Sequence, residues 1–387
     1  MDQPIGLYLH IPFCERKCTY CDFNSYSGLN DLIPTYTAAL VREVELWGSS
    51  GQYTVKTVFF GGGTPSELPL QQLEAILAAV SASFTLLPGA EISLEANPGT
   101  VDRGYLEGLL RLGVNRLSLG VQSFDDAELA ALTRIHSADE ARRAYEDARS
   151  AGFRRINLDL IYGLAHQGIE RWVANIEEAL RLAPEHLSLY ALSVEPGTVL
   201  FKQVRSGRAP GPDADLQAEM YEYTVSAMDA AGFHRYEVSN WARQDEECRH
   251  NLVYWHNEPY LGVGCGAHSY FQGRRFNVVN PPRQYVAAMR DAHPGDPWAM
   301  PQLENIGFID ESTRLAETLM LGLRLDEGVR LDALERDFPE VMPHYAETFK
   351  RFEGLGLLQR QGHVLKLSQR GVLLSNEVFE EILVPNR

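Results

Sequence analysis

The chain has 387 residues, with 35 Lys and Arg against 52 Asp and Glu, and its formal net charge is −17 at pH 7. This charge argues against a general nucleic-acid binder, because neutralising phosphates requires a basic face. A composition of 45% hydrophobic and 22% charged residues is typical of a soluble globular protein. No apolar run approaches the roughly 18 residues of a membrane span, and the N-terminus lacks signal-peptide features. We therefore expect a cytoplasmic protein with no membrane span.

Short β-rich apolar runs alternate with longer amphipathic runs through the first half of the chain. This alternation predicts βα units around a parallel sheet. Gly113, Gly152 and Pro184 each follow a helical segment and precede a strand, where helix ends are expected. The predicted strands cover residues 7–11, 55–60, 91–95, 116–119, 155–161 and 186–192. The predicted helices cover residues 35–47, 70–83, 103–112, 127–151 with a break near residue 135, and 170–182.

The remainder of the chain has a different organisation. Residues 206–213, SGRAPGPD, are polar and rich in Gly and Pro, so a boundary is expected there, followed by a helix over 214–231. Residues 233–280 have the pattern of strands and loops with many aromatic residues. After residues 296–301, the sequence predicts helices, a hairpin about Gly362 and a final helix, which is a winged-helix pattern. The expected parts are a partial barrel over 1–205, an accessory segment over 206–300 and a helical or winged-helix domain over 301–387.

Three of the five cysteines, Cys14, Cys18 and Cys21, lie within eight residues in the spacing C-x3-C-x2-C. An odd count in a chain of this length argues against a disulfide framework, so shared metal binding is the better interpretation. Three close thiolates suit an iron–sulfur cluster better than structural zinc, which usually takes four ligands. The alternative is a zinc site completed by His10. A three-cysteine cubane leaves one iron open to a small molecule.

Glycine-rich and polar residues follow the next predicted strands. The run Gly61–Gly62–Gly63 precedes Thr64, and consecutive glycines let a ligand approach bare backbone amides. Polar residues at the ends of apolar strands cost burial energy unless they bind something, and in a βα barrel these ends share one face. We therefore expect one site built from several strand ends. The polar residues concerned are Glu95, Gln122, Asp159, Tyr162 and Arg134.

Together these motifs resemble the radical S-adenosylmethionine (SAM) superfamily, and Tyr20 before the third cysteine fits that pattern. In order, YLHIPFC, GGGTP, E-x-N-P, GVQSF, Arg134 and DLIYGL resemble the oxygen-independent coproporphyrinogen III oxidase family over residues 8 to about 165. The resemblance implies an incomplete (β/α)6 barrel and SAM cleaved by an electron to methionine and a deoxyadenosyl radical. It implies a 4Fe-4S cluster held by Cys14, Cys18 and Cys21. It implies SAM contacts from Tyr8, Gly62, Gly63, Thr64, Glu95, Gln122, Arg134 and Asp159, with Tyr20 nearby.

Two features depart from the oxidase pattern. The fourth cysteine expected two residues after Cys21 is absent, and only 13 residues precede Cys14. In both features the sequence resembles the haem-chaperone branch, HemW. That branch implies a carrier that passes haem to an acceptor protein, with an electron donor for the cluster. The alternatives are radical decarboxylation of coproporphyrinogen III and a purely structural scaffold, so whether the chain is an enzyme stays open.

The haem-chaperone branch carries an H-N-x-x-Y-W motif, which stands here at residues 250–255. A histidine can ligate haem iron and aromatic rings can cover a porphyrin, so His250, Tyr254 and Trp255 are haem candidates, with Cys248 as another ligand candidate. The alternative is that His250 and Asn251 cap a turn while Tyr254 and Trp255 fill the core. A second glycine-rich turn, residues 262–269, is expected to pack against the SAM pocket, with Cys265 as a small buried residue.

Overall fold

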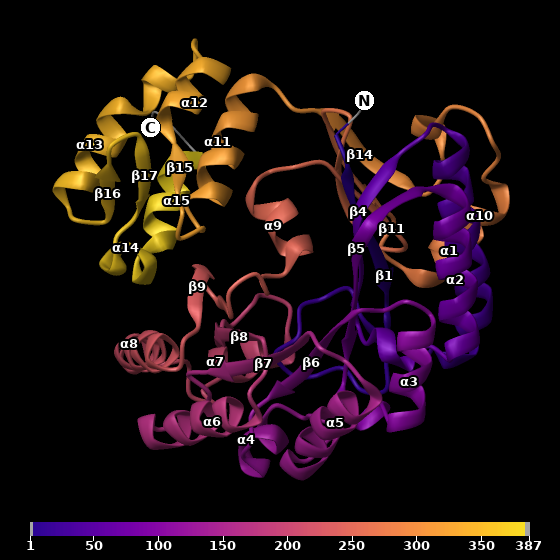
Figure 1. Ribbon diagram of the computed structural model, residues 1–387, viewed down its shortest axis with the longest axis horizontal. Helices are drawn as coiled ribbons and strands as arrows, with labels where there is room; N and C mark the ends of the chain where they lie inside the picture. The colour runs from indigo at the N-terminus through magenta and orange to yellow at the C-terminus, as the bar shows by residue number, and fades with distance from the viewer. Residues whose placement is uncertain (1–2, 384–387) are drawn as a thin grey trace.

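The computed structural model describes residues 3–383, in which a run of six parallel strands alternates with helices along the chain (Figure 1). These strands are neighbours in the order β1-β4-β5-β6-β7-β8. Parallel pairing brings their carboxyl ends to one edge, where sites of α/β barrels form. The expected incomplete (β/α)6 barrel is confirmed. In chain order its elements are β1 (Ile5–Ile11), α1 (Ile33–Ser49), β4 (Thr54–Gly62), α2 (Leu70–Ser83), β5 (Thr85–Ala96), α3 (Arg103–Arg111), β6 (Arg116–Gln122), α4 (Asp126–Ala131), α5 (Ala138–Ala151), β7 (Ile156–Tyr162), α6 (Ile169–Leu182) and β8 (His186–Ala191).

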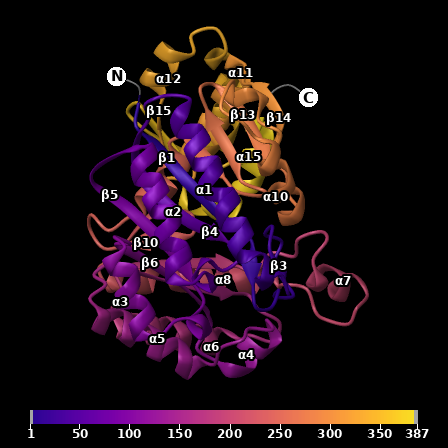
Figure 2. The same ribbon diagram turned by 90° about the vertical axis from the view of Figure 1, so that its right-hand side faces the viewer.

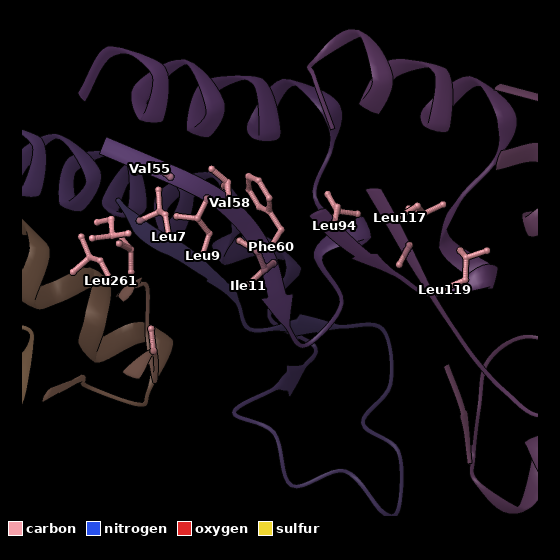
Figure 3. Close-up of a cluster of buried hydrophobic side chains, with 14 of the residues drawn as sticks. Leu7, Leu9, Ile11, Val55, Val58, Phe60, Leu94, Leu117, Leu119 and Leu261 are labelled. Carbon is pink, nitrogen blue, oxygen red and sulfur yellow. The ribbon is translucent and has the colours of Figure 1, made fainter. Parts of the chain in front are cut away.

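The core is built from apolar side chains on these strands. Leu7, Leu9 and Ile11 are fully buried and alternate along β1 with Tyr8 and His10, since successive side chains of a strand point to opposite faces. Each buried leucine contributes about 1.5–3 kcal/mol. Figure 3 shows the same layer continuing across neighbouring strands through Val55, Val58, Phe60, Leu94, Leu117, Leu119 and Leu261.

The predicted break near residue 135 separates α4 from α5. Ser137 begins α5 with a capping box, in which its hydroxyl accepts from the Glu140 amide and the Glu140 carboxylate accepts from the Ser137 amide. The connection between the two helices carries Arg134, which lines the pocket described below. The break between the two helices therefore places Arg134 at the pocket.

The sheet extends beyond the barrel on both edges to twelve strands. Strand β11 (Tyr260–Val263) pairs parallel with β1, and β12 (His268–Phe271), β13 (Arg274–Val278) and β14 (Leu303–Phe308) continue antiparallel. At the other edge lie β10 (Asn240–Ala242) and β9 (His234–Glu237). Because β14 still belongs to this sheet, the sheet continues past residue 300. The expected domain boundaries stay predictions.

Helix α9 (Arg249–Trp255) lies within the segment expected to contain only strands and loops, and that expectation was wrong here. The helix has seven residues and depends on a distant cap, because the Glu91 carboxylate accepts from the backbone amides of Arg249 and His250, both at 3.1 Å. A cap 158 residues away leaves no signal in the local sequence. The sequence analysis also did not predict α7 (Val199–Arg205). The other two helices between β8 and β14 are α8 (Ala214–Ala230) and α10 (Pro282–Asp291).

The C-terminal part forms a small domain, separated from the barrel strands by α9 (Figure 1). It contains the predicted hairpin, in which Gly362 adopts φ +62°. Within residues 3–383 no helix is both long and apolar enough to cross a membrane. The elements of this domain are α11 (Glu311–Gly322), β15 (Val329–Arg330), α12 (Leu331–Asp337), α13 (Ala346–Gly354), β16 (Leu358–Gln361), β17 (Val364–Leu367), α14 (Gln369–Leu373) and α15 (Ser375–Leu383).

Candidate functional site

A pocket of about 360 Å³ lies at the carboxyl ends of the parallel strands. One wall is the cysteine loop, which we define as residues 14–25, and the rest comes from the ends of strands β4 to β8. The strand ends and the cysteines therefore line one pocket, except that Tyr162, which was expected there, is buried against Trp172 instead. Of the predicted residues, the pocket is lined by Cys14, Cys18, Tyr20, Cys21, Gly62, Gly63, Thr64, Glu95, Gln122, Arg134 and Asp159.

The cysteine loop is closed at its base and braced across its middle. Strand β2 (Phe13–Cys14) pairs with β3 (Tyr26–Ser27), which brings the two ends of the loop together. The Lys17 ammonium donates to the carbonyl oxygens of Phe23 and Ser25 at 3.0 and 3.1 Å. These bonds fold the loop back on itself, so that its three thiols lie along one pocket.

Each thiol of the loop has a polar neighbour. Burial raises the pKa of the Cys14 and Cys21 thiols above their ordinary value. Such a thiol is protonated when it is free and becomes a thiolate when it coordinates a metal. This chemistry fits the iron–sulfur cluster implied by the motif. The neighbours are the Thr64 hydroxyl at 3.4 Å from Cys14 Sγ, Arg134 Nη1 at 3.6 Å from Cys18 Sγ, and Ser25 Oγ at 3.8 Å from Cys21 Sγ.

The alternative zinc site completed by His10 is not formed. Both ring nitrogens of His10 are engaged, Nδ1 with the Tyr8 hydroxyl at 3.0 Å and Nε2 with the Asn24 carbonyl oxygen at 2.8 Å. In the described part of the chain, no three His, Cys, Asp or Glu side chains converge on a single ion. A cubane does not need such convergence, because each cysteine binds a different iron.

The glycine turn after β4 packs directly on the cysteine loop. A Cβ on Gly63 would lie 2.7 Å from the Phe13 carbonyl oxygen and 3.0 Å from Cys14 Sγ. A Cβ on Gly62, whose φ is +117°, would lie 2.6 Å from the His10 ring. No side chain fits at either position, so these glycines permit the close approach of two backbones.

The amides of this turn are already used within the protein, which corrects the expectation that they are bare. Gly62 N donates to the Glu95 carboxylate at 3.2 Å. The amides of Gly63 and Thr64 each donate at 2.8 Å to carbonyl oxygens of residues 11 and 13. The turn therefore shapes the pocket rather than offering free donors.

Two carboxyl groups lie in the pocket on the strand ends. Burial, and next the neighbouring Asp159, raise the pKa of Glu95 to about 8. Burial also raises the pKa of Asp159, although it accepts from the Ser118 hydroxyl at 2.9 Å and from the Asn157 amide at 2.8 Å. At neutral pH Glu95 thus holds a proton that a nearby cation would displace. This part of the pocket can bind an ammonium group.

Arg134 supplies the opposite charge. Its Nη2 donates to the Gly120 carbonyl oxygen at 2.6 Å, while its Nε is buried without a partner in the described structure. A buried unpaired N–H of a cation is costly, so the position suits a bound carboxylate. Burial raises the pKa of Tyr20 and the Arg134 charge opposes that shift. Gln122 ends β6 in a left-handed conformation, with φ +68°.

Tyr8 is the one predicted SAM contact that does not line the pocket. Its ring stacks on Phe59, with centroids 6.3 Å apart. A Cβ on Gly61 would lie 3.0 Å from the Tyr8 ring and 3.2 Å from Glu95 Oε2. The Tyr8 ring therefore packs beside Gly61, close to the Glu95 carboxylate. A contact of Tyr8 with SAM stays a prediction.

The residues of the H-N-x-x-Y-W motif lie apart from the pocket, in α9. His250 is fully buried and bonds to the Thr57 hydroxyl through Nδ1 and to the Tyr254 hydroxyl through Nε2, both at 2.8 Å. Burial lowers the pKa of His250 to about 3, so the ring is neutral. Ligation of haem iron by His250 would first require the loss of one of these bonds. It is therefore His250 that fills the core rather than capping a turn, while Tyr254 and Trp255 are half-buried.

Of the other haem candidates, Cys248 is buried, whereas Tyr254 and Trp255 are half-buried. Burial raises the pKa of the Cys248 thiol to about 12, and its Sγ lies 3.6 Å from the Glu91 carboxylate. The Trp255 ring lies under the Arg324 guanidinium at 4.6 Å, which joins α9 to the C-terminal domain. These described residues form no open site for iron or porphyrin. Haem binding by Cys248, Tyr254 or Trp255 stays a prediction.

One residue of the cysteine loop was missed by the sequence analysis. The Asn24 side chain donates to the carbonyl oxygens of Cys265 and Asn280, both at 3.0 Å. A Cβ on Gly266 would lie 2.2 Å from Asn24 Nδ2, so the second glycine turn packs behind the cysteine loop. As expected, Cys265 is buried. No local signal could identify Asn24, because its partners lie 241 and 256 residues away.

Comparisons with known proteins agree with this architecture. The chain matches the Radical SAM superfamily over residues 8–179 and the HemN C-terminal domain over residues 309–374. Among solved structures it is similar to coproporphyrinogen III oxidase (HemN) from Escherichia coli, with a TM-score of 0.85 and 21% identity over 99% of this chain and 91% of that one. This likeness shows a shared fold.

Relatives of known name are similar along most of the chain. The heme chaperone HemW of Bacillus subtilis is 37% identical, covering 97% of this chain and 98% of its own. The heme chaperone HemW of Escherichia coli is 40% identical over 84% of each chain. The mouse radical S-adenosyl methionine domain-containing protein 1, mitochondrial, is 40% identical over 84% of this chain and 74% of its own. At this identity, the chain belongs to the radical SAM superfamily and, within it, to the HemW family.

Proposed function

We propose that the chain is a haem chaperone that binds haem and passes it to an acceptor protein. The observation that carries this proposal is the 37% identity with a heme chaperone over 97% of the chain. The sequence after Cys21, which continues with Asp22 and Phe23 and has no fourth cysteine, supports the carrier over the oxidase. Five free cysteines suit a reducing compartment, so we place this function in the cytoplasm.

Within this function, Cys14, Cys18 and Cys21 would hold a 4Fe-4S cluster, and the adjoining pocket would hold SAM. When bound, the cluster supplies an electron for reductive chemistry on SAM. Glu95 would hold the ammonium group of SAM and Arg134 would hold its carboxylate, so the two opposite charges would orient the amino-acid end. Glu95 releases its proton as the ammonium group arrives, because the new cation removes the cost of the buried charge.

The direct test is a haem titration of anaerobically reconstituted protein, followed through the Soret band. Wild type and Cys18→Ala are compared, with Cys248→Ala as the matched control because Cys248 is a buried cysteine outside the loop. We expect saturable haem binding by wild type. Cys18→Ala should lose iron and the visible absorption of the cluster, since two thiolates rarely retain a cubane. Cys248→Ala should retain the cluster, and its haem affinity tests the ligand candidate at that position.

The functional step is then measured as transfer of haem from the loaded protein to a haem-free acceptor haemoprotein, with a one-electron reductant supplied for the cluster. Transfer without change of the porphyrin supports the carrier. Absence of saturable haem binding by wild type contradicts it. In that case the alternative is tested by adding coproporphyrinogen III, SAM and reductant and measuring loss of the propionate carboxyl groups as carbon dioxide.

A further inference from the structure

Helix α7 presents an outward face with a cationic and aromatic character. A helical repeat of 3.6 residues places Phe201, Lys202 and Arg205 on one side, and Leu200 and Val204 on the other. The outward side borders a shallow hollow of about 430 Å³, lined by Gly197, Phe201, Lys202, Arg205 and Ser206. Among the described residues, no carboxylate lines this hollow.

The two cations of this face have no anionic partner. Within residues 3–383, neither Lys202 nor Arg205 is within 4.0 Å of a carboxylate oxygen, and neither side chain makes a hydrogen bond to another side chain. The chain carries 52 acidic against 35 basic residues, so carboxylates are plentiful elsewhere on it. Two adjacent unpaired cations beside an aromatic ring form a surface that suits an anionic, partly apolar ligand.

The other side of α7 packs against the cysteine loop and the wall of the cluster pocket. The Leu200 amide donates to the carbonyl oxygen of Thr19 in the cysteine loop at 2.9 Å. On its inward side Leu200 packs with Tyr20 against a small buried cluster that includes Leu192, which lines the cluster pocket. Figure 2 shows α7 projecting from the side of the molecule next to β3, which closes the same loop.

Apolar surface is also exposed at this place. Val199, at the start of α7, is 52% exposed. Large apolar side chains with this exposure cost free energy in water unless something covers them. Val199 and Phe201 therefore add apolar side chains to the two cations within one short helix.

We infer that the α7 face is the docking site for haem, and this inference rests on the proposed function. Haem is a flat apolar macrocycle with two carboxylates on one edge. Lys202 and Arg205 bind those propionates, and Phe201 and Val199 contact the apolar part. Haem docked here lies on the side of α7 opposite to Leu200, whose amide joins the helix to the cysteine loop.

The test compares haem affinity of full-length, cluster-loaded wild type with that of Lys202→Glu/Arg205→Glu. The matched control is Arg290→Glu/Lys350→Glu, which makes the same change in net charge at exposed positions on α10 and α13. Exposed ion pairs each contribute a several-fold factor in affinity, and charge reversal adds repulsion. We expect the haem Kd to rise about 10- to 30-fold in the α7 variant and less than about twofold in the control.

Haem dimethyl ester, in which both carboxylates are blocked, distinguishes propionate binding at the α7 face from a general effect of charge reversal on the protein. Wild type should bind the ester about as weakly as the α7 variant binds haem, and the variant should show no further loss with the ester. Equal haem affinity of wild type and the α7 variant, or an ester that binds wild type as well as haem does, overturns the inference while leaving the proposed function intact. A wild type that binds no haem at all overturns the proposed function itself.

Discussion

Replacement of His250 by alanine separates a structural role from an iron-ligand role. The ring is fully buried, stacks on Phe59 with centroids 5.0 Å apart, and bonds to Thr57 and Tyr254. A haem ligand would instead need one ring nitrogen free to face the iron. We therefore expect His250→Ala to lower the stability of the fold and to leave haem affinity unchanged.

The expected magnitude follows from the hydrogen bonds and the packing of the imidazole ring. Two hydrogen bonds of 2.8 Å contribute about 1 kcal/mol each, and without the ring the hydroxyl groups of Thr57 and Tyr254 have no partner there. Removal of a buried ring adds the cost of a cavity. Together these terms lower the free energy of unfolding by about 3–5 kcal/mol. His363, which is exposed, provides the control His363→Ala, with an expected change within about 0.5 kcal/mol.

The assay is urea unfolding followed by circular dichroism, paired with a haem titration at a temperature where the variant is folded. A loss of stability below about 1 kcal/mol would refute the packing argument. A folded variant whose haem Kd rises tenfold or more, with a changed Soret maximum, would show instead that His250 reaches the iron.

Three further predictions concern the pocket. Gly63→Ala places a methyl group 2.7 Å from a backbone oxygen and should displace Cys14, so iron content after reconstitution should fall while Gly295→Ala, in open space, retains it. Asn24→Ala removes the two hydrogen bonds donated to carbonyl oxygens and the one accepted from the Tyr26 hydroxyl, worth about 1 kcal/mol each, and the cluster should bleach in air at least about tenfold faster. Glu95, with a pKa raised to about 8, binds a proton in the folded chain that the unfolded chain releases near its ordinary value. SAM-free protein should therefore lose stability as pH rises from about 4.5 to about 8, and Glu95→Gln should flatten this slope in urea unfolding.

These predictions fail in distinct ways. Full iron content in Gly63→Ala would mean that the glycine turn and the cysteine loop can separate without cost. Unchanged bleaching in Asn24→Ala would show that the loop is held by its own internal bonds alone. The same pH slope in Glu95→Gln as in wild type would assign the titration to another group, with Asp159 as the nearest acid.

The sequence predicted the parts of the site that depend on neighbours along the chain. Alternating apolar runs identify the six barrel strands, because period and length are local properties. The spacing of Cys14, Cys18 and Cys21 indicates a cluster because one short loop must supply all three ligands. Polar residues at strand ends predict a shared pocket, since parallel strands present their carboxyl ends on one edge.

Tertiary structure decided what depends on partners distant in sequence. His250 could be read as an iron ligand until its bond to Thr57, 193 residues away, showed both nitrogens engaged. Asn24 gains its role only from carbonyl groups of the second glycine turn and its surroundings. Helix α9 exists where strands and loops were expected because Glu91 caps it from β5. A hydrogen bond between distant segments leaves no periodic trace in either, so these features were decided by the packed fold and not by the local pattern.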